Sequence, residues 1–98
     1  MKDLKIELMR PKATYRARGI SRSALYNDVA QGLWTNPIKL GKRASGWPRH
    51  EVDALNLARI GGMSEENIRR LVRTLENRRK QASSEIADIL SLGMEVIP

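Results

Sequence analysis

The chain has 98 residues, enough for one small domain or one domain with a helical extension, and leaves little room to enclose a deep substrate pocket. It contains no cysteine, which excludes a disulfide framework, a thiolate zinc site and a cysteine nucleophile. The net charge of +7 lies in the first half: residues 1–50 hold eleven Lys/Arg and three Asp/Glu (+8), residues 51–98 hold seven and eight (−1), and such a cluster of cations attracts phosphate groups.

We expect a cytoplasmic protein that does not contact a membrane. The N-terminal residues, MKDLK, are followed by no long apolar run, so the sequence predicts no signal peptide. No stretch approaches the roughly 18 apolar residues that a membrane-spanning helix needs. The lack of cysteine fits a reducing compartment.

The first predicted element is a short strand over residues 3–9. Leu4, Ile6 and Leu8 alternate with charged residues, and a period of two is typical of a half-buried strand. We therefore expect these three side chains to face the core.

A helix is predicted next, from Pro11 to Arg18. Proline suits the first turn of a helix, where no backbone amide donor is needed. We expect this helix to place Tyr15 against the core and to leave Arg16 and Arg18 near solvent.

The segment after this helix predicts a tight turn and a second helix over residues 22–31. Gly19 can adopt the left-handed conformation that ends a helix, and Ile20 is expected to enter the core. Ser21 is a suitable N-cap, because its hydroxyl can accept a free backbone amide of the next turn. Two helices joined by a short turn that contains glycine form a helix-turn-helix.

The second helix has an apolar face and a small polar face. At 100° per residue, Leu25 and Val29 share the side that we expect to be buried. Ser23, Asn27 and Ala30 lie opposite, and Tyr26 lies at the edge. A solvated helix face more often carries Glu and Lys, so this composition favours recognition of a partner.

Residues 33–48 predict a hairpin, with strands over 37–40 and 45–47. Lys42 and Arg43 lie in its connection, and Trp34 and Trp47 are expected in the core. Pro48 then opens a third helix over residues 49–60, with Val52 and Leu55 facing inward. We thus predict a mainly α fold with a small β-hairpin wing: a winged helix-turn-helix domain over 1–62 and a C-terminal helical extension over 63–98.

The extension carries an apolar stripe. Ser64 is expected to cap a fourth helix, and apolar residues then recur with steps of four, three, seven, four and three. They are Ile68, Val72, Leu75, Ala82, Ile86 and Ile89. This spacing resembles the seam of a coiled coil, interrupted at Arg79, and predicts a homodimer through these six residues. Two alternatives stay open: the stripe folds back on the chain's own core, or Ser83-Ser84 divides the segment into two helices.

Two segments resemble the AlpA-type prophage regulators. GISRSALY at residues 19–26 resembles the family's turn and second helix, and PIKLGKRASGW at residues 37–47 resembles its wing. EVDA at residues 51–54 is similar to the helix that follows. Asn27 stands where the family often has a basic residue, and residues 63–98 lie outside the resemblance.

The resemblance implies a sequence-specific protein that binds double-stranded DNA and regulates a phage or mobile element. Control of transcription is the first hypothesis, and an excisionase that bends attachment-site DNA is the alternative. A hypothesis from another functional class is an adaptor that binds a partner protein through its helical extension.

The residues expected to contact DNA lie on the first two helices and in the wing. They are Arg16, Arg18, Ser21, Arg22, Ser23, Tyr26, Asn27, Lys39, Lys42 and Arg43. Arg22 and Asn27 are candidates for base contacts, and the wing cations for phosphate or minor-groove contacts. Tyr26 either donates to a phosphate or packs its ring under the wing.

No enzyme, cofactor or metal site is expected. His50 is the only histidine, and with no cysteine and no further ligand near Glu51 and Asp53 it predicts a surface residue. One histidine does not supply a set of nucleophile, base and orienting group.

Overall fold

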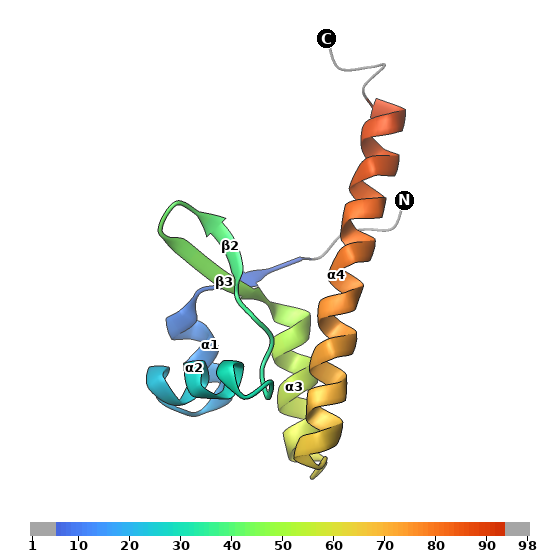
Figure 1. The fold of residues 1–98 in the computed structure, drawn as a ribbon. Helices are drawn as coiled ribbons and strands as arrows, with labels where there is room; N and C mark the ends of the chain where they lie inside the picture. The colour runs from blue at the N-terminus through green and yellow to red at the C-terminus, as the bar shows by residue number, and fades with distance from the viewer. Residues whose placement is uncertain (1–5, 94–98) are drawn as a thin grey trace.

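The computed structural model describes residues 6–93 and shows a mainly α fold with a small antiparallel sheet (Figure 1). The elements are β1 (Leu8–Met9), α1 (Pro11–Arg18), α2 (Arg22–Ala30), β2 (Ile38–Gly41), β3 (Ala44–Pro48), α3 (Arg49–Ile60) and α4 (Glu65–Gly93). The strand order is β1-β3-β2, so β3 lies between the N-terminal strand and the outer strand of the hairpin. The predicted fold class, a mainly α fold with a hairpin wing and a long C-terminal helix, is confirmed.

The first two helices form as their local signals predict. Gly19 ends α1 with φ of 81°, a left-handed conformation that favours glycine, and its backbone amide reaches the carbonyls of Tyr15 and Arg16. The Ser21 hydroxyl accepts a hydrogen bond from the backbone amide of Ala24 at 3.2 Å and so caps α2. Tyr15 packs against the core, as predicted.

The prediction for the N-terminal strand is wrong in its length and in its buried face. Of residues 6–9, which are the described part of this strand, only two pair: Leu8 with Pro48 and Met9 with Trp47. Ile6 and Leu8 are 65 % and 46 % exposed, and Met9 packs against the core instead. With so few paired residues the alternation does not decide which side is buried. Leu4 lies outside the described residues.

The wing is the predicted hairpin, with Lys42 and Arg43 at its turn. Gly46 lies where β3 passes between β1 and β2, and a Cβ atom at this position would lie 2.6 Å from the Met9 carbonyl oxygen and 2.9 Å from Leu40 Cδ1. Any side chain here would force the wing and β1 apart.

The core lies between α2, the sheet, α3 and the first half of α4. Its buried hydrophobic residues are Leu25, Leu33, Trp34, Trp47, Val52, Leu55, Ala58, Ile68, Val72 and Leu75. Both tryptophans are buried as predicted, and the Trp47 indole donates a hydrogen bond of 2.7 Å to the Thr35 carbonyl. The indole therefore fixes the base of the wing to the segment that follows α2.

The fourth helix is one continuous helix, so Ser83-Ser84 does not divide it. The Ser64 hydroxyl caps it by accepting from the Asn67 amide at 3.2 Å, as predicted. Within residues 6–93, no helix combines the length and apolar character required to cross a membrane.

The apolar stripe of α4 has two different environments. Ile68, Val72 and Leu75 are buried in the domain's own core. The prediction that they form an interface between two copies is therefore wrong for these three residues. Ala82 and Ile86 are exposed and Ile89 is half-buried, beyond the part of α4 that contacts the core.

Candidate nucleic-acid interface

The polar face of α2 is exposed. Arg22, Ser23, Asn27 and Ala30 face solvent, while Leu25 is fully buried on the opposite side. The helix is short and its N-terminus carries no acidic residue in the first turn. This face is therefore shaped and charged to approach an anionic surface.

Arg22, Tyr26 and Trp47 form a series of contacts that joins α2 to the wing. The Tyr26 ring meets the Trp47 ring edge-on, with centroids 5.9 Å apart and an interplanar angle of 60°. The Arg22 guanidinium lies 5.5 Å from the centroid of the Tyr26 ring. Of the two alternatives for Tyr26, its ring does pack under the wing. It thereby holds Arg22 at the start of α2.

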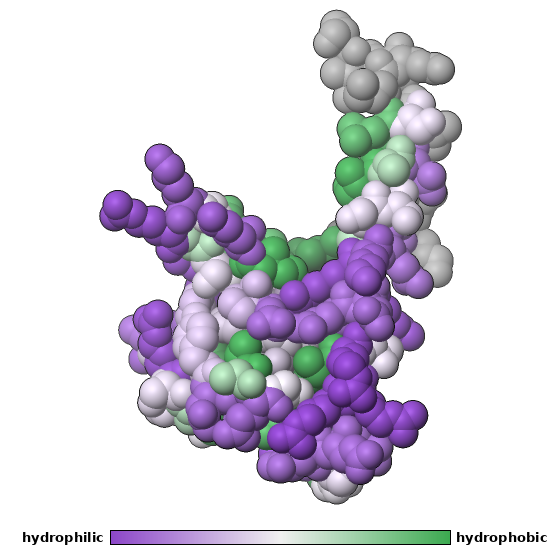
Figure 2. Space-filling model, in the orientation of Figure 1, coloured by the Kyte–Doolittle hydropathy of each residue, from purple (hydrophilic) through white to green (hydrophobic). Residues whose placement is uncertain are grey.

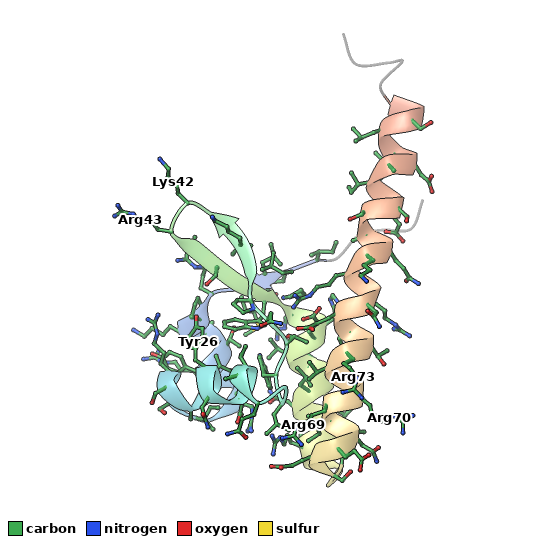
Figure 3. All side chains as sticks on the ribbon, viewed as in Figure 1. Tyr26, Lys42, Arg43, Arg69, Arg70 and Arg73 are labelled. Carbon is green, nitrogen blue, oxygen red and sulfur yellow. The ribbon has the colours of Figure 1, made fainter. Side chains whose placement is uncertain are left out.

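The wing carries exposed cations. Lys42 and Arg43 project from its tip (Figure 3), and Lys39 is exposed on β2. The wing and α2 extend from the same side of the molecule, opposite α4 (Figure 1). Among residues 6–93, the ion pairs within 4.0 Å involve none of Arg22, Lys39, Lys42 or Arg43. These charges are free to meet an external anion.

The two arginines of α1 differ. Arg16 is exposed as expected. The expectation that Arg18 lies near solvent is wrong: its side chain is 15 % exposed, pairs with Asp28 at 3.3 Å and lies 5.8 Å from the Trp34 ring centroid. Arg18 therefore joins α1 to α2 inside the domain and is not part of the candidate interface.

The described residues contain no metal-binding cluster. His50 is exposed, and no group of three or more His, Asp or Glu side chains in residues 6–93 gathers to hold a metal ion. A shallow hollow of about 300 Å³ lies between α3 and α4. Its lining is apolar and carries no titratable group: Ala54, Leu57, Ala58, Gly61, Met63 and Leu71.

Sequence reasoning missed the cations of α4. Arg70 and Arg73 are exposed on its first half, and Arg69 donates a hydrogen bond to the carbonyl of Gln31 at 2.9 Å (Figure 3). The net charge of residues 51–98 gave no sign of these cations, because it counts Glu51 and Glu76 against them. In the structure Glu51 is buried against Arg79 and Glu76 accepts hydrogen bonds from Asn36. Hydrophilic side chains accordingly cover the wing tip and the first half of α4, whereas apolar side chains gather on the distal part of α4 (Figure 2).

Comparison with known proteins gives one family. Residues 7–54 match the model of a family described as prophage CP4-57 regulatory protein (AlpA). The match runs from β1 into α3 and therefore includes α2 and the whole wing. Neither the curated proteins nor the solved structures compared with the chain gave a match.

Proposed function

Since residues 7–54 make the chain a member of the AlpA family of prophage regulatory proteins, we propose that it is a sequence-specific regulator that binds double-stranded DNA. The observation that carries this proposal is the exposure of the polar residues of α2 and of the wing cations. The two elements that carry them extend from the same side of the molecule (Figure 1). In this arrangement α2 enters the major groove and the wing contacts the adjacent backbone or minor groove.

The exposed residues divide between reading bases and holding phosphates. Arg22 can pair with guanine in bidentate geometry and Asn27 with adenine, because both side chains lie on the outward face of α2. Ser23 can donate to either a base or a phosphate. Lys42 and Arg43 can contact the phosphates of the DNA backbone. Arg16 and Lys39 belong to the same group of phosphate contacts.

Two residues support the surface from within. The Ser21 hydroxyl already caps α2, so its main contribution is the position of the helix N-terminus. Tyr26 supports Arg22, because its ring lies under the Arg22 guanidinium and meets the Trp47 ring edge-on.

Selection of bound sequences from a random duplex pool, followed by fluorescence anisotropy on the selected duplex, tests the proposal. Arg22→Ala should lower affinity for the selected duplex by about 1–3 kcal/mol and leave random duplexes nearly unaffected. Arg43→Ala should weaken binding to every duplex and reduce the slope of log affinity against log salt by about 0.9. Arg78→Ala, an exposed arginine on α4, is the matched control.

Binding that ignores sequence and survives both substitutions would defeat the proposal. Transcriptional control and excision would use the same surface and differ in what happens to the DNA. Circular-permutation gel shifts separate them: a single site without a bend favours an operator-binding regulator, and adjacent sites with a bend favour an excisionase.

A further inference from the structure

The first half of α4 holds both ends of the segment that joins α2 to the wing. At the start of this segment, the Arg69 Nε atom donates to the Gln31 carbonyl at 2.9 Å. At its end, the Asn36 backbone amide and side-chain amide donate to one oxygen of Glu76 at 2.7 and 3.0 Å. Gln31 is the C-cap residue directly after α2, and Asn36 lies two residues before β2 begins. One helix therefore contacts the end of α2 and the base of the wing.

The contacts lie on one side of α4, at a fixed spacing. Arg69 and Glu76 are seven residues apart, so they share a face of the helix and lie two turns, or about 10 Å, apart along it. The middle of the joining segment is held separately, because Leu33, Trp34 and Thr35 are buried. Its two ends are exposed at Gln31 and Asn36 and are held by these side chains of α4.

The helix that makes these contacts is itself immobilised. Ile68 and Val72 are buried in the core beside Arg69, and Leu75 is buried beside Glu76. One turn further on, Arg79 forms two hydrogen bonds of 2.6 and 2.8 Å with Glu51 at the start of α3. The two attachment points therefore belong to a helix that is packed firmly against the domain.

We propose that Arg69 and Glu76 are positioning residues that set the distance and angle between α2 and the wing, and thereby the DNA sequence that the protein selects. The inference rests on the proposed function and extends it to a helix outside the matched residues 7–54. Neither residue has to touch DNA, because a displaced wing or α2 would misalign the base contacts of Arg22 and Asn27.

Spin labels on the free protein test the geometric part without DNA. The chain has no cysteine, so Ala30→Cys on α2 and Lys42→Cys at the wing tip give one unique pair of labels. Double electron–electron resonance should show a narrow distance distribution in the parent protein and a broadened or shifted one after Glu76→Ala. Glu85→Ala, which removes an exposed carboxylate from the distal part of α4, is the matched control and should change nothing.

The unlabelled proteins test recognition. The ratio of affinities for the selected and random duplexes should fall roughly tenfold in Glu76→Ala, as expected when one base contact is lost. It should be unchanged in Glu85→Ala, which alters the net charge equally. Glu76→Gln keeps an acceptor oxygen and should recover most of the selectivity. Arg69→Ala against Arg78→Ala, an exposed arginine of α4 outside the candidate interface, gives a second, independent comparison. Thermal unfolding confirms that each variant is folded at the assay temperature.

A label distance in Glu76→Ala that equals that of Glu85→Ala would overturn the inference. So would a changed distance with full selectivity. A parent protein that selects no duplex defeats the proposed function and with it the role in recognition. The spin-label comparison would then still report whether α4 fixes the wing.

Discussion

Glu51 is a carboxylate placed almost entirely out of water. Only 1 % of its side chain is exposed, and both of its oxygens accept hydrogen bonds from Arg79, at 2.6 and 2.8 Å. A buried charge is tolerated when it is paired and hydrogen-bonded, and it becomes costly when the partner is removed. This pair therefore makes the docking of α4 on α3 depend on one arginine.

Arg79→Ala should lower the free energy of unfolding by about 3 kcal/mol, because it leaves the Glu51 carboxylate buried without a partner. Urea denaturation checks this value. Arg78→Ala, on the exposed neighbouring residue, should stay within about 0.5 kcal/mol of the parent. Equal stability of the two variants would contradict the assigned role of the pair.

Gly46 is a second residue that the packing fixes. Gly46→Ala should destabilise the domain by about 1–3 kcal/mol, since the new methyl group meets the Met9 carbonyl and Leu40. The methyl group of Gly41→Ala would have Ala44 Cβ at 3.9 Å, an ordinary contact, and this variant serves as the control. Thermal unfolding of both proteins decides the matter, and a Gly46→Ala protein as stable as Gly41→Ala would refute the steric explanation.

At the scale of elements, the sequence predicts the helices well where their ends carry local signals. Pro11, Gly19 and Ser21 mark the ends of α1 and the start of α2, and the structure uses each of them as expected. Within the described residues, the strand predicted over 3–9 is reduced to Leu8 and Met9, because its extent depends on pairing with β3, about 40 residues away, and not on its own alternation. The length of α4 is likewise decided by packing and not by Ser83-Ser84.

The candidate interface is predictable to a similar extent. The outward face of α2 follows from helical period, and the exposed tip of the wing follows from its turn. The burial of Arg18 could not be predicted from helical period, because its partners Asp28 and Trp34 lie outside α1. The contacts of α4 with Gln31 and Asn36 join residues 38 and 40 positions apart, so no local sequence pattern predicts them.

The first half of α4 is expected to be indispensable for folding and its distal part dispensable. A chain that ends at residue 62 loses Ile68, Val72 and Leu75 from the core, each contributing about 1.5–3 kcal/mol, which together rival the whole stability of a small domain. A chain that ends at residue 81 keeps all three and Arg79. Thermal unfolding followed by circular dichroism should show a cooperative transition for the longer chain only. A cooperative transition for both chains would show that the domain folds without α4 and would contradict this prediction.

At the scale of the whole molecule, α4 extends the domain into an elongated shape with extents of 48 × 28 × 22 Å (Figure 1). Ile86 and Leu90, on its distal part, are 53 % and 47 % exposed. Ala82, Ile86 and Ile89 continue, with heptad spacing, the face that is buried further down the same helix. The domain's own core leaves this part of the face uncovered.

Pairing of two copies stays a prediction and is now confined to Ala82, Ile86 and Ile89. Light scattering over a range of concentrations should show a weak dimer, because the exposed strip is short compared with a standard interface. Ile86→Glu should abolish it, and Ser84→Glu, an equal change of charge at an exposed polar position, should not. A monomer at high micromolar concentration would exclude self-association through this strip.

The pairing of Glu51 with Arg79 also limits how this recognition unit can be transplanted. The segment 7–54 that matches the family model contains Glu51, whereas Arg79 lies 28 residues further along the chain. A chimera that grafts only the family segment onto another scaffold would inherit a charge with no counterion. Donor and recipient sequences should therefore be joined after Arg79, so that the graft carries its own neutralising residue.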